Sequence, residues 1–156
     1  MNGVIQAIQD AEITLTSNTA TLPFSIVDLR TRCAQNCQGF MNHNEGSALF
    51  SILDGGNYEV HFNANVTSAA AGQVALALFA DGVPVQGTEM DEEVTTVGAF
   101  KSISFSKIVR VCCKGTVNLA IGSLPTVTYN GGATSVVTDT QVPTLKNANI
   151  YIERLS

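Results

Sequence analysis

The sequence predicts an all-β protein that folds as a sandwich or barrel, and three observations support this prediction. Apolar and polar residues alternate along several segments, most cleanly over residues 58–67, and this is the period of a half-buried strand. Turn-forming pairs separate these segments at short intervals, as at Asp54-Gly55, Asp81-Gly82 and Lys114-Gly115. After residue 11 no segment keeps a helical period for three turns. Many short strands at such spacing are typical of sandwiches and barrels.

The N-terminal segment is the exception. Residues 3–11 place Val4, Ala7, Ile8 and Ala11 at helical spacing, which predicts a short helix or an arm. From Glu12 onward we expect strands over residues 12–15, 20–27, 47–53, 58–68, 73–80, 83–85, 100–113, 116–122, 126–129, 134–137 and 148–155.

Two long strands are each expected to have one apolar side. Over residues 58–67 this side consists of Tyr58, Val60, Phe62, Ala64 and Val66. Its opposite side carries Glu59, His61, Asn63, Asn65 and Thr67, and is predicted to face water or another subunit. Over residues 101–113 the apolar side consists of Ile103, Phe105, Val109, Val111 and Cys113.

The segment QVALALFA at residues 73–80 does not alternate. Val74, Leu76 and Leu78 point one way, and Phe79 points the other way together with two alanines. We expect this strand to carry more apolar surface than one sandwich can bury. A closed cyclic oligomer would cover the excess.

Composition excludes several classes of partner. The chain has 156 residues, enough for one domain with its own core, and only 13% of them are charged. A net charge of −5 with scattered basic residues argues against nucleic acid. No apolar run is long enough to span a membrane, and residues 1–18 lack the pattern of a secretory signal. We therefore expect a protein that is made in the cytoplasm and is soluble there.

Residues 47–156 resemble the trimeric jelly rolls of the tumour-necrosis-factor-like superfamily. The resemblance rests on the strand from Tyr58 to Val66 with the apolar strand and Asp81-Gly82-Val83-Pro84 after it, on VCCKG at residues 111–115, and on NIYIER at residues 149–154. Bacterial and phage members are the most similar, among them heads of spore-surface fibres and small virion proteins. Because no Gly-X-Y stalk precedes the domain, a phage protein is favoured over a spore fibre.

The resemblance implies a homotrimeric virion protein, either a head fibre or a capsid decoration protein, located on the virion and in contact with the major capsid protein or other virion proteins. It also implies two parts, an arm with the first strands over residues 1–45 and a jelly-roll core over 46–156. The arm would dock on the capsid through Val4, Ile5 and Ile8. The trimer interface is expected to contain Val74, Leu76, Leu78, Phe79, His61, Asn63 and Tyr151.

Four cysteines are the first candidates for chemistry. Adjacent cysteines on a strand point to opposite faces, and the four thiols lack two CxxC-like knuckles, so a zinc site of Cys33, Cys37, Cys112 and Cys113 is the weaker alternative. We favour free thiols packed as small residues, with Cys33-Cys37 as the disulfide if oxidation occurs. No metal or other cofactor is expected.

The remaining titratable groups do not form a catalytic pattern. The acidic run Glu89–Glu93 is interpreted as a solvated loop, and neither His43 nor His61 has a partner near it in sequence. No G-x-S-x-G or phosphate-binding motif is present. We therefore expect no catalytic activity. A receptor- or glycan-binding module, using the loops at 87–98 and 124–133 on host surface glycans, stays open as an alternative, and a depolymerase is a weaker one.

Overall fold

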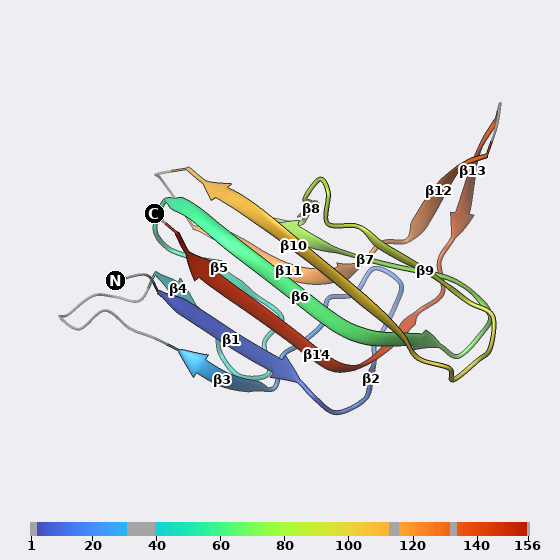
Figure 1. Cartoon of the computed structure of the whole chain (residues 1–156), viewed down its shortest axis with the longest axis horizontal. Helices are drawn as coiled ribbons and strands as arrows, with labels where there is room; N and C mark the ends of the chain where they lie inside the picture. The colour runs from blue at the N-terminus through green and yellow to red at the C-terminus, as the bar shows by residue number, and fades with distance from the viewer. Residues whose placement is uncertain (1–2, 31–39, 113–115, 132–133, 156) are drawn as a thin grey trace.

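The computed structural model describes residues 3–30, 40–112, 116–131 and 134–155, and within them it contains strands and no helix (Figure 1). The strands are β1 (Val4–Gln9), β2 (Ile13–Thr14), β3 (Ile26–Arg30), β4 (Met41–Asn42), β5 (Phe50–Ile52), β6 (Gly56–Ser68), β7 (Gly72–Ala80), β8 (Val83–Pro84), β9 (Met90–Val94), β10 (Lys101–Val111), β11 (Val117–Ser123), β12 (Thr126–Gly131), β13 (Thr134–Asp139) and β14 (Pro143–Arg154). The prediction of an all-β fold is confirmed.

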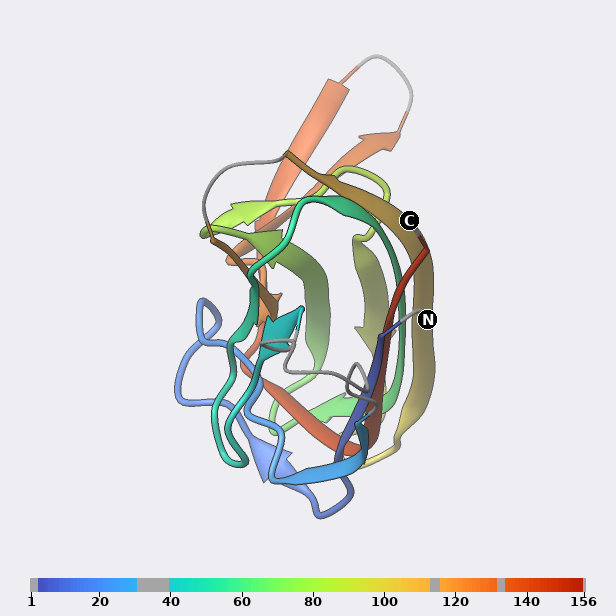
Figure 2. The same cartoon turned by 90° about the vertical axis from the view of Figure 1, so that its left-hand side faces the viewer.

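Two antiparallel sheets pack face to face (Figure 2). Sheet A has the order β10-β6-β14-β1-β3, with β2 also paired to β14. Sheet B has the order β4-β5-β11-β7-β8, with β9 also paired to β7. Several neighbouring strands come from distant parts of the sequence, such as β6 and β14 in sheet A and β5 and β11 in sheet B, as in a jelly roll.

The core lies between the sheets and contains the predicted apolar side of β6. Tyr58, Val60, Phe62 and Val66 are at most 1% exposed. Phe24 contacts the ring of Phe62 edge to face, with 6.5 Å between ring centroids. Phe24 also meets Phe50 of sheet B edge to face at 5.5 Å, so aromatic rings join the two sheets.

The N-terminal helix or arm is not observed, because residues 4–9 form β1 between β14 and β3 in sheet A. Ile5 pairs with Ile152 and is 1% exposed, so it belongs to the core and cannot dock on another molecule. Burial alternates along β1, with Ile5, Ala7 and Gln9 inward, although each side of the strand mixes apolar and polar residues. Hydrogen bonding to two neighbouring strands therefore decides the conformation, and the local pattern does not. The range 1–45 is therefore not separate from 46–156, as the pairing of β4 with β5 across this boundary also shows.

Strand β7 is buried on both sides within a single chain. Val74, Leu76 and Leu78 are 0% exposed in the core, and the alanines between them are 0–1% exposed. On the alanine side, the ring of Phe79 lies over Gly122, which is paired with Ala77. The expectation that one sandwich cannot bury this strand is wrong, because small alanines need only a thin cover.

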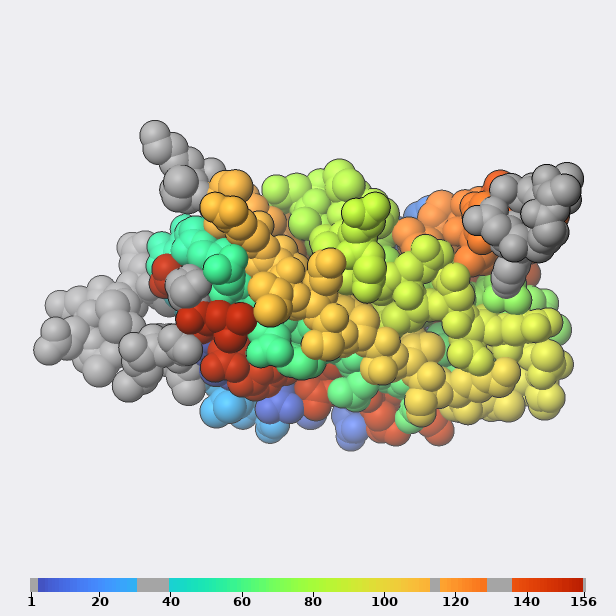
Figure 3. Space-filling model, turned by 45° about the horizontal axis from the view of Figure 1, so that its top comes forward, coloured from blue at the N-terminus to red at the C-terminus, as the bar shows by residue number. Residues whose placement is uncertain are grey.

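The strands β12 and β13 form a separate two-stranded hairpin that extends from one end of the sandwich (Figures 1 and 3). Its base is fixed by Thr140, whose amide donates to the carbonyl of Pro125 at 3.0 Å. Val136 and Val137 on β13 are 55% and 63% exposed.

Candidate subunit-interaction face

The outer face of sheet A, which points away from the core, combines side chains from adjacent strands in continuous rows. Strand pairing places His61 of β6 opposite Tyr151 of β14, and Tyr151 opposite Gln6 of β1. The next row contains Asn63, Asn149 and Ile8. The rings of His61 and Tyr151 lie 5.9 Å apart between centroids. Three of the predicted interface residues, His61, Asn63 and Tyr151, thus lie together on one face.

Acidic groups form the third row of this face. Glu59 and Glu153 are paired across β6 and β14, where like charges oppose each other. Glu59 Oε1 lies 3.0 Å from His61 Nε2, and the Tyr151 hydroxyl donates to Glu153 Oε2 at 3.0 Å. Burial raises the pKa of Tyr151, and the hydrogen bond to Glu153 and the nearby carboxylates add to this. The row is held by hydrogen bonds within the chain.

Apolar side chains border these polar rows. Ile8 pairs with Ile26 of β3, and Gln6 pairs with Leu29, so both β3 side chains join this face. Ile26 and Leu29 are each 45% exposed. On the opposite edge, Ile108 of β10 is 58% exposed and lies opposite Glu59. Strand β10 lies open along this side of the molecule (Figure 3). Exposed apolar groups beside paired polar groups are typical of an interface.

The remaining predicted interface residues lie elsewhere. Val74, Leu76 and Leu78 are buried in the core of their own chain, so they have no surface to offer a second subunit. Phe79 lies on the outer face of sheet B, on the other side of the sandwich. Of the predicted docking residues, Val4 and Ile8 lie on the outer face of sheet A, with Val4 opposite Glu153.

Sequence reasoning missed Gln6, Ile26, Leu29 and Ile108 as members of this face. Ile108 could have been found from its spacing, because it shares the strand side of Ser104 and Ser106, where an isoleucine is out of place. The β1 and β3 residues depend on pairing between strands, which the local pattern does not reveal.

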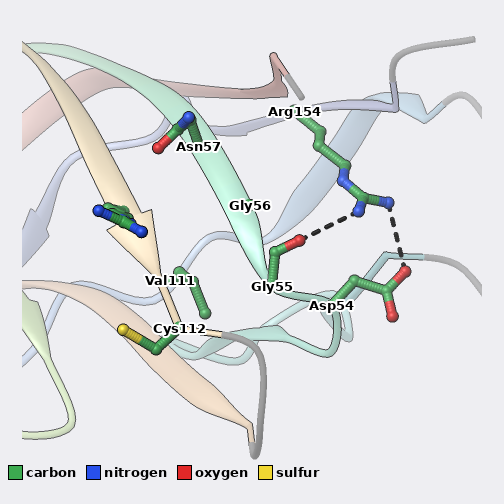
Figure 4. Close-up of a pocket in the computed structure, with 8 residues that line it drawn as sticks. Asp54, Gly55, Gly56, Asn57, Val111, Cys112 and Arg154 are labelled. Carbon is green, nitrogen blue, oxygen red and sulfur yellow. Dashed lines mark hydrogen bonds and ion pairs between the residues drawn. The ribbon is translucent and has the colours of Figure 1, made fainter.

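A cavity of about 580 Å³ opens where the ends of β6, β10 and β14 meet (Figure 4). It is lined by Asp54, Gly55, Gly56, Asn57, Arg110, Val111, Cys112 and Arg154. The Arg154 guanidinium is 3.3 Å from Asp54 Oδ2 and donates to the Gly55 carbonyl at 3.0 Å. These bonds tie the end of β14 to the turn before β6. The described lining of the cavity also includes the thiol of Cys112.

Comparison with known proteins identifies the fold. No protein-family model matches the sequence, and no curated protein matches it. Solved structures do match over nearly the whole chain. The globular domain of a zebrafish complement 1qA protein aligns with a TM-score of 0.63 at 10% identity, covering 99% of this chain and 98% of its own.

Murine APRIL aligns with a TM-score of 0.58 at 9% identity, covering 99% of this chain and 100% of its own. Eiger TNF from S. frugiperda aligns with a TM-score of 0.56 at 8% identity, covering 100% of this chain and 92% of its own. The chain has the jelly-roll fold of these structures. At these identities the likeness establishes the fold alone, and it confirms the TNF-like fold that the sequence predicts.

The described part of the jelly roll contains no cluster of three or more His, Cys, Asp or Glu side chains that could hold a metal ion. Cys112 is an exposed free thiol, whereas Cys33, Cys37 and Cys113 lie outside the described residues. Nor does any helix in the described ranges have the length and hydrophobicity needed to cross a membrane.

The acidic run of the jelly roll is a strand and not a loop. Residues 90–94 form β9, which pairs with β7 through Asp91 opposite Ala75. The register brings Met90 and Val94 inward, at 6% and 2% exposure, and Asp91 and Glu93 outward. Glu92 shares the side of Met90, opposite Val74, and is partly exposed. Burial together with a hydrogen bond and charge from Glu89 raises the pKa of Asp91 to about 6.

The two histidines of the jelly roll have different environments. His43 is 4% exposed and stacks on Phe50, with 4.0 Å between ring centroids. Its Nδ1 lies 3.0 Å from the Leu49 carbonyl, to which it donates. Burial lowers the pKa of His43, so the ring is a neutral core residue. His61 is partly exposed and belongs to the interaction face.

Proposed function

We propose that the chain is the subunit of a homotrimer that assembles through the outer face of sheet A. In this proposal the trimer is a structural protein of a virion, either a phage head fibre or a capsid decoration protein, and has no catalytic activity. The observation that carries it is the composition of the face itself, where Val4, Ile8, Ile26, Leu29 and Ile108 surround the polar row of His61 and Tyr151.

The exposed apolar groups favour burial against another chain. Ile26, Leu29 and Ile108 are each at least 45% exposed, and covering apolar surface is favourable by about 25 cal/mol per Å². They lie at the two edges of the face, on β3 and β10. A neighbour that contacts both edges in a closed ring would cover them without leading to open-ended growth.

Charge on the face supports contact between identical chains. Glu59 and Glu153 form an acidic pair, and Arg110, on the same side of β10, has no partner among the described residues. In an assembly of copies, the arginine of one chain can pair with the acids of the next. Like charges alone would keep the copies apart.

A role on the surface of a particle follows from the phage proteins that the sequence resembles. The open hairpin β12–β13 and the low charge content also suit a protein that works by contact.

Quantitative mass spectrometry of purified particles from the source tests this proposal. We expect the chain at a fixed copy number that is a multiple of three, with density for a three-fold head fibre or decoration in electron micrographs. Absence of the chain from the particles would contradict the virion role. Particles carrying the chain as single copies would contradict the trimer.

A further inference from the structure

A second cavity, of about 300 Å³, lies on the outer face of sheet B. It is lined by Thr19, Thr21, Leu49, Phe79, Asp81, Gly82, Asn118, Ala120 and Gly122. We propose that it binds a neutral saccharide, with one face of the sugar ring against Phe79 and its hydroxyl groups on Asp81 and Asn118. This inference is independent of the proposed trimer.

The hollow exists because β11 presents very small residues at this point. Ala120 and Gly122 form its floor, and a Cβ atom on Gly122 would lie 2.8 Å from the Phe79 ring. Phe79 and Leu49 supply apolar surface, and Leu49 is 46% exposed. A flat aromatic ring beside a shallow floor suits a ligand that is itself a ring with an apolar face.

Two polar side chains at one end of the cavity are fixed by the chain. The backbone N–H of Asn118 donates to Asp81 Oδ1 at 2.9 Å. The backbone N–H of Asp81 donates to the backbone carbonyl of Asn118, also at 2.9 Å. Ser51 Oγ donates to Asn118 Oδ1 at 2.7 Å, and this bond orients the side-chain amide of Asn118. Both positions are therefore set before any ligand binds, which lowers the entropic cost of binding.

The same bonds leave hydrogen-bonding capacity unused. A carboxylate has about four acceptor sites, and Asp81 uses one of them within the chain. With Asn118 Oδ1 directed to Ser51, the two N–H groups of its side chain are available as donors. Thr21 also lines the cavity. Neighbouring sugar hydroxyls can donate to Asp81 and accept from Asn118 at the same time.

Other classes of ligand match less well. No lining residue in the described part of the chain is cationic, and Asp81 would repel a phosphate or a carboxylate. An apolar peptide side chain would cover Asp81 and Asn118 without replacing their bonds to water, which is costly. A hydroxylated ring can pack its apolar face on Phe79 and hydrogen-bond to Asp81 and Asn118 at the same time.

The cavity is open to an external ligand. It lies on sheet B, whereas the proposed subunit contacts use the outer face of sheet A on the other side of the sandwich. Gly82 adds open backbone beside Asp81, with nothing within 4 Å of where its Cβ would be.

Amide spectra of the isotope-labelled chain, titrated with glucose, galactose, mannose and N-acetylglucosamine, test the inference. We expect at least one sugar to shift the amides of Phe79, Gly82, Asn118 and Gly122. Asp81→Asn should weaken this sugar's affinity about tenfold, a loss of about 1.4 kcal/mol. Asparagine tolerates the positive φ of 49° at this turn and can still accept from Asn118. The variant therefore removes the carboxylate and keeps the local fold.

Asp54→Asn is the matched control, because Asp54 lines the cavity beside Cys112 and Arg154 and not the proposed sugar site. This variant should leave the affinity for the sugar unchanged. Phe79→Leu keeps the apolar character but removes the flat ring, so it should also weaken binding. The inference is overturned if none of the four sugars shifts these amides, if the shifts lie elsewhere, or if Asp81→Asn binds as well as the unchanged chain. Amide signals far from the cavity should keep the positions that they have in the unchanged chain, and this shows that each variant is folded.

Discussion

Glu59 of β6 and Glu153 of β14 lie directly opposite each other on the outer face of sheet A. Two carboxylates in this position oppose folding of the free chain. The chain offsets this with His61, 3.0 Å from Glu59, and with the hydroxyl of Tyr151, which donates to Glu153. The pair lies near the ends of β6 and β14, where the proposed trimer would bring a cation of another chain against it.

Changing Ile108 to Glu should dissociate the trimer without unfolding the chain. Ile108 is 58% exposed on the edge strand β10 and lies opposite Glu59, so a carboxylate here adds repulsion where apolar contact is expected. Light scattering should report a monomer mass, with an unchanged far-ultraviolet spectrum. Val83→Glu on β8, where the side chain is 65% exposed in sheet B, is the control and should stay trimeric. If both variants assemble alike, the outer face of sheet A is not the interface.

Changing Ile5 to Ala should destabilise the chain by about 2–5 kcal/mol. Ile5 is 1% exposed and packs in the core from β1, so the smaller side chain leaves a cavity. Urea unfolding measures the loss. Val83→Ala should change the free energy of unfolding by no more than about 0.5 kcal/mol, because this side chain is exposed. Equal, small effects would mean that residues 4–9 are not part of the sheet.

Replacing Gly122 by Val should cost about 1–3 kcal/mol, because the new side chain overlaps the ring of Phe79. In a Phe79→Ala background the same replacement should cost about 1 kcal/mol less, since the ring is gone. Denaturant unfolding of the two single variants and the double variant gives this coupling. Strictly additive effects would show that Phe79 does not pack on Gly122.

Asp91 should make the chain less stable as the pH rises through about 6. Burial, followed by Glu89, raises the pKa of Asp91 to about 6 from its ordinary value of 3.8. Between these two values the folded chain binds more protons than the unfolded chain, so its stability falls with rising pH. The penalty is complete above pH 6 and absent below about pH 4.

Asp91→Asn should therefore raise the free energy of unfolding at pH 7 and have little effect near pH 4, in urea titrations at several pH values. Glu89→Gln should remove only part of the pH dependence, because burial is the larger cause. A gain in stability from Asp91→Asn that is the same at pH 4 and pH 7 would contradict a raised pKa.

Strands with one wet side could be predicted from the sequence, and strands with other environments could not. On β6 the alternation correctly predicted the buried side from Tyr58 to Val66, because one side packs in the core and the other is more exposed. Thr67, which the same alternation placed on the wet side, is only 4% exposed, so the pattern fails at the end of the strand. On β1 the inward residues include Gln9, at 8% exposure, so the apolar pattern did not separate strand from helix. On β7 the apolar alanines of the outer side led to the prediction of a subunit interface, although Ala75 and Ala77 are already buried within the single chain.

The same reasons limit what the sequence revealed about the candidate face. His61 and Asn63 follow from the alternation of β6 alone. That β3 contributes Ile26 and Leu29 depends on its pairing with β1, a contact between segments about twenty residues apart. Local patterns contain no information on which strands become neighbours, so only the structure assembles the face.

The mass of the unchanged chain in solution is the most direct measurement of the central claim. Light scattering on purified protein at micromolar concentration should give three times the 16.4 kDa mass of one chain, and this value should persist on dilution. A mass of one chain under these conditions would contradict assembly through the outer face of sheet A.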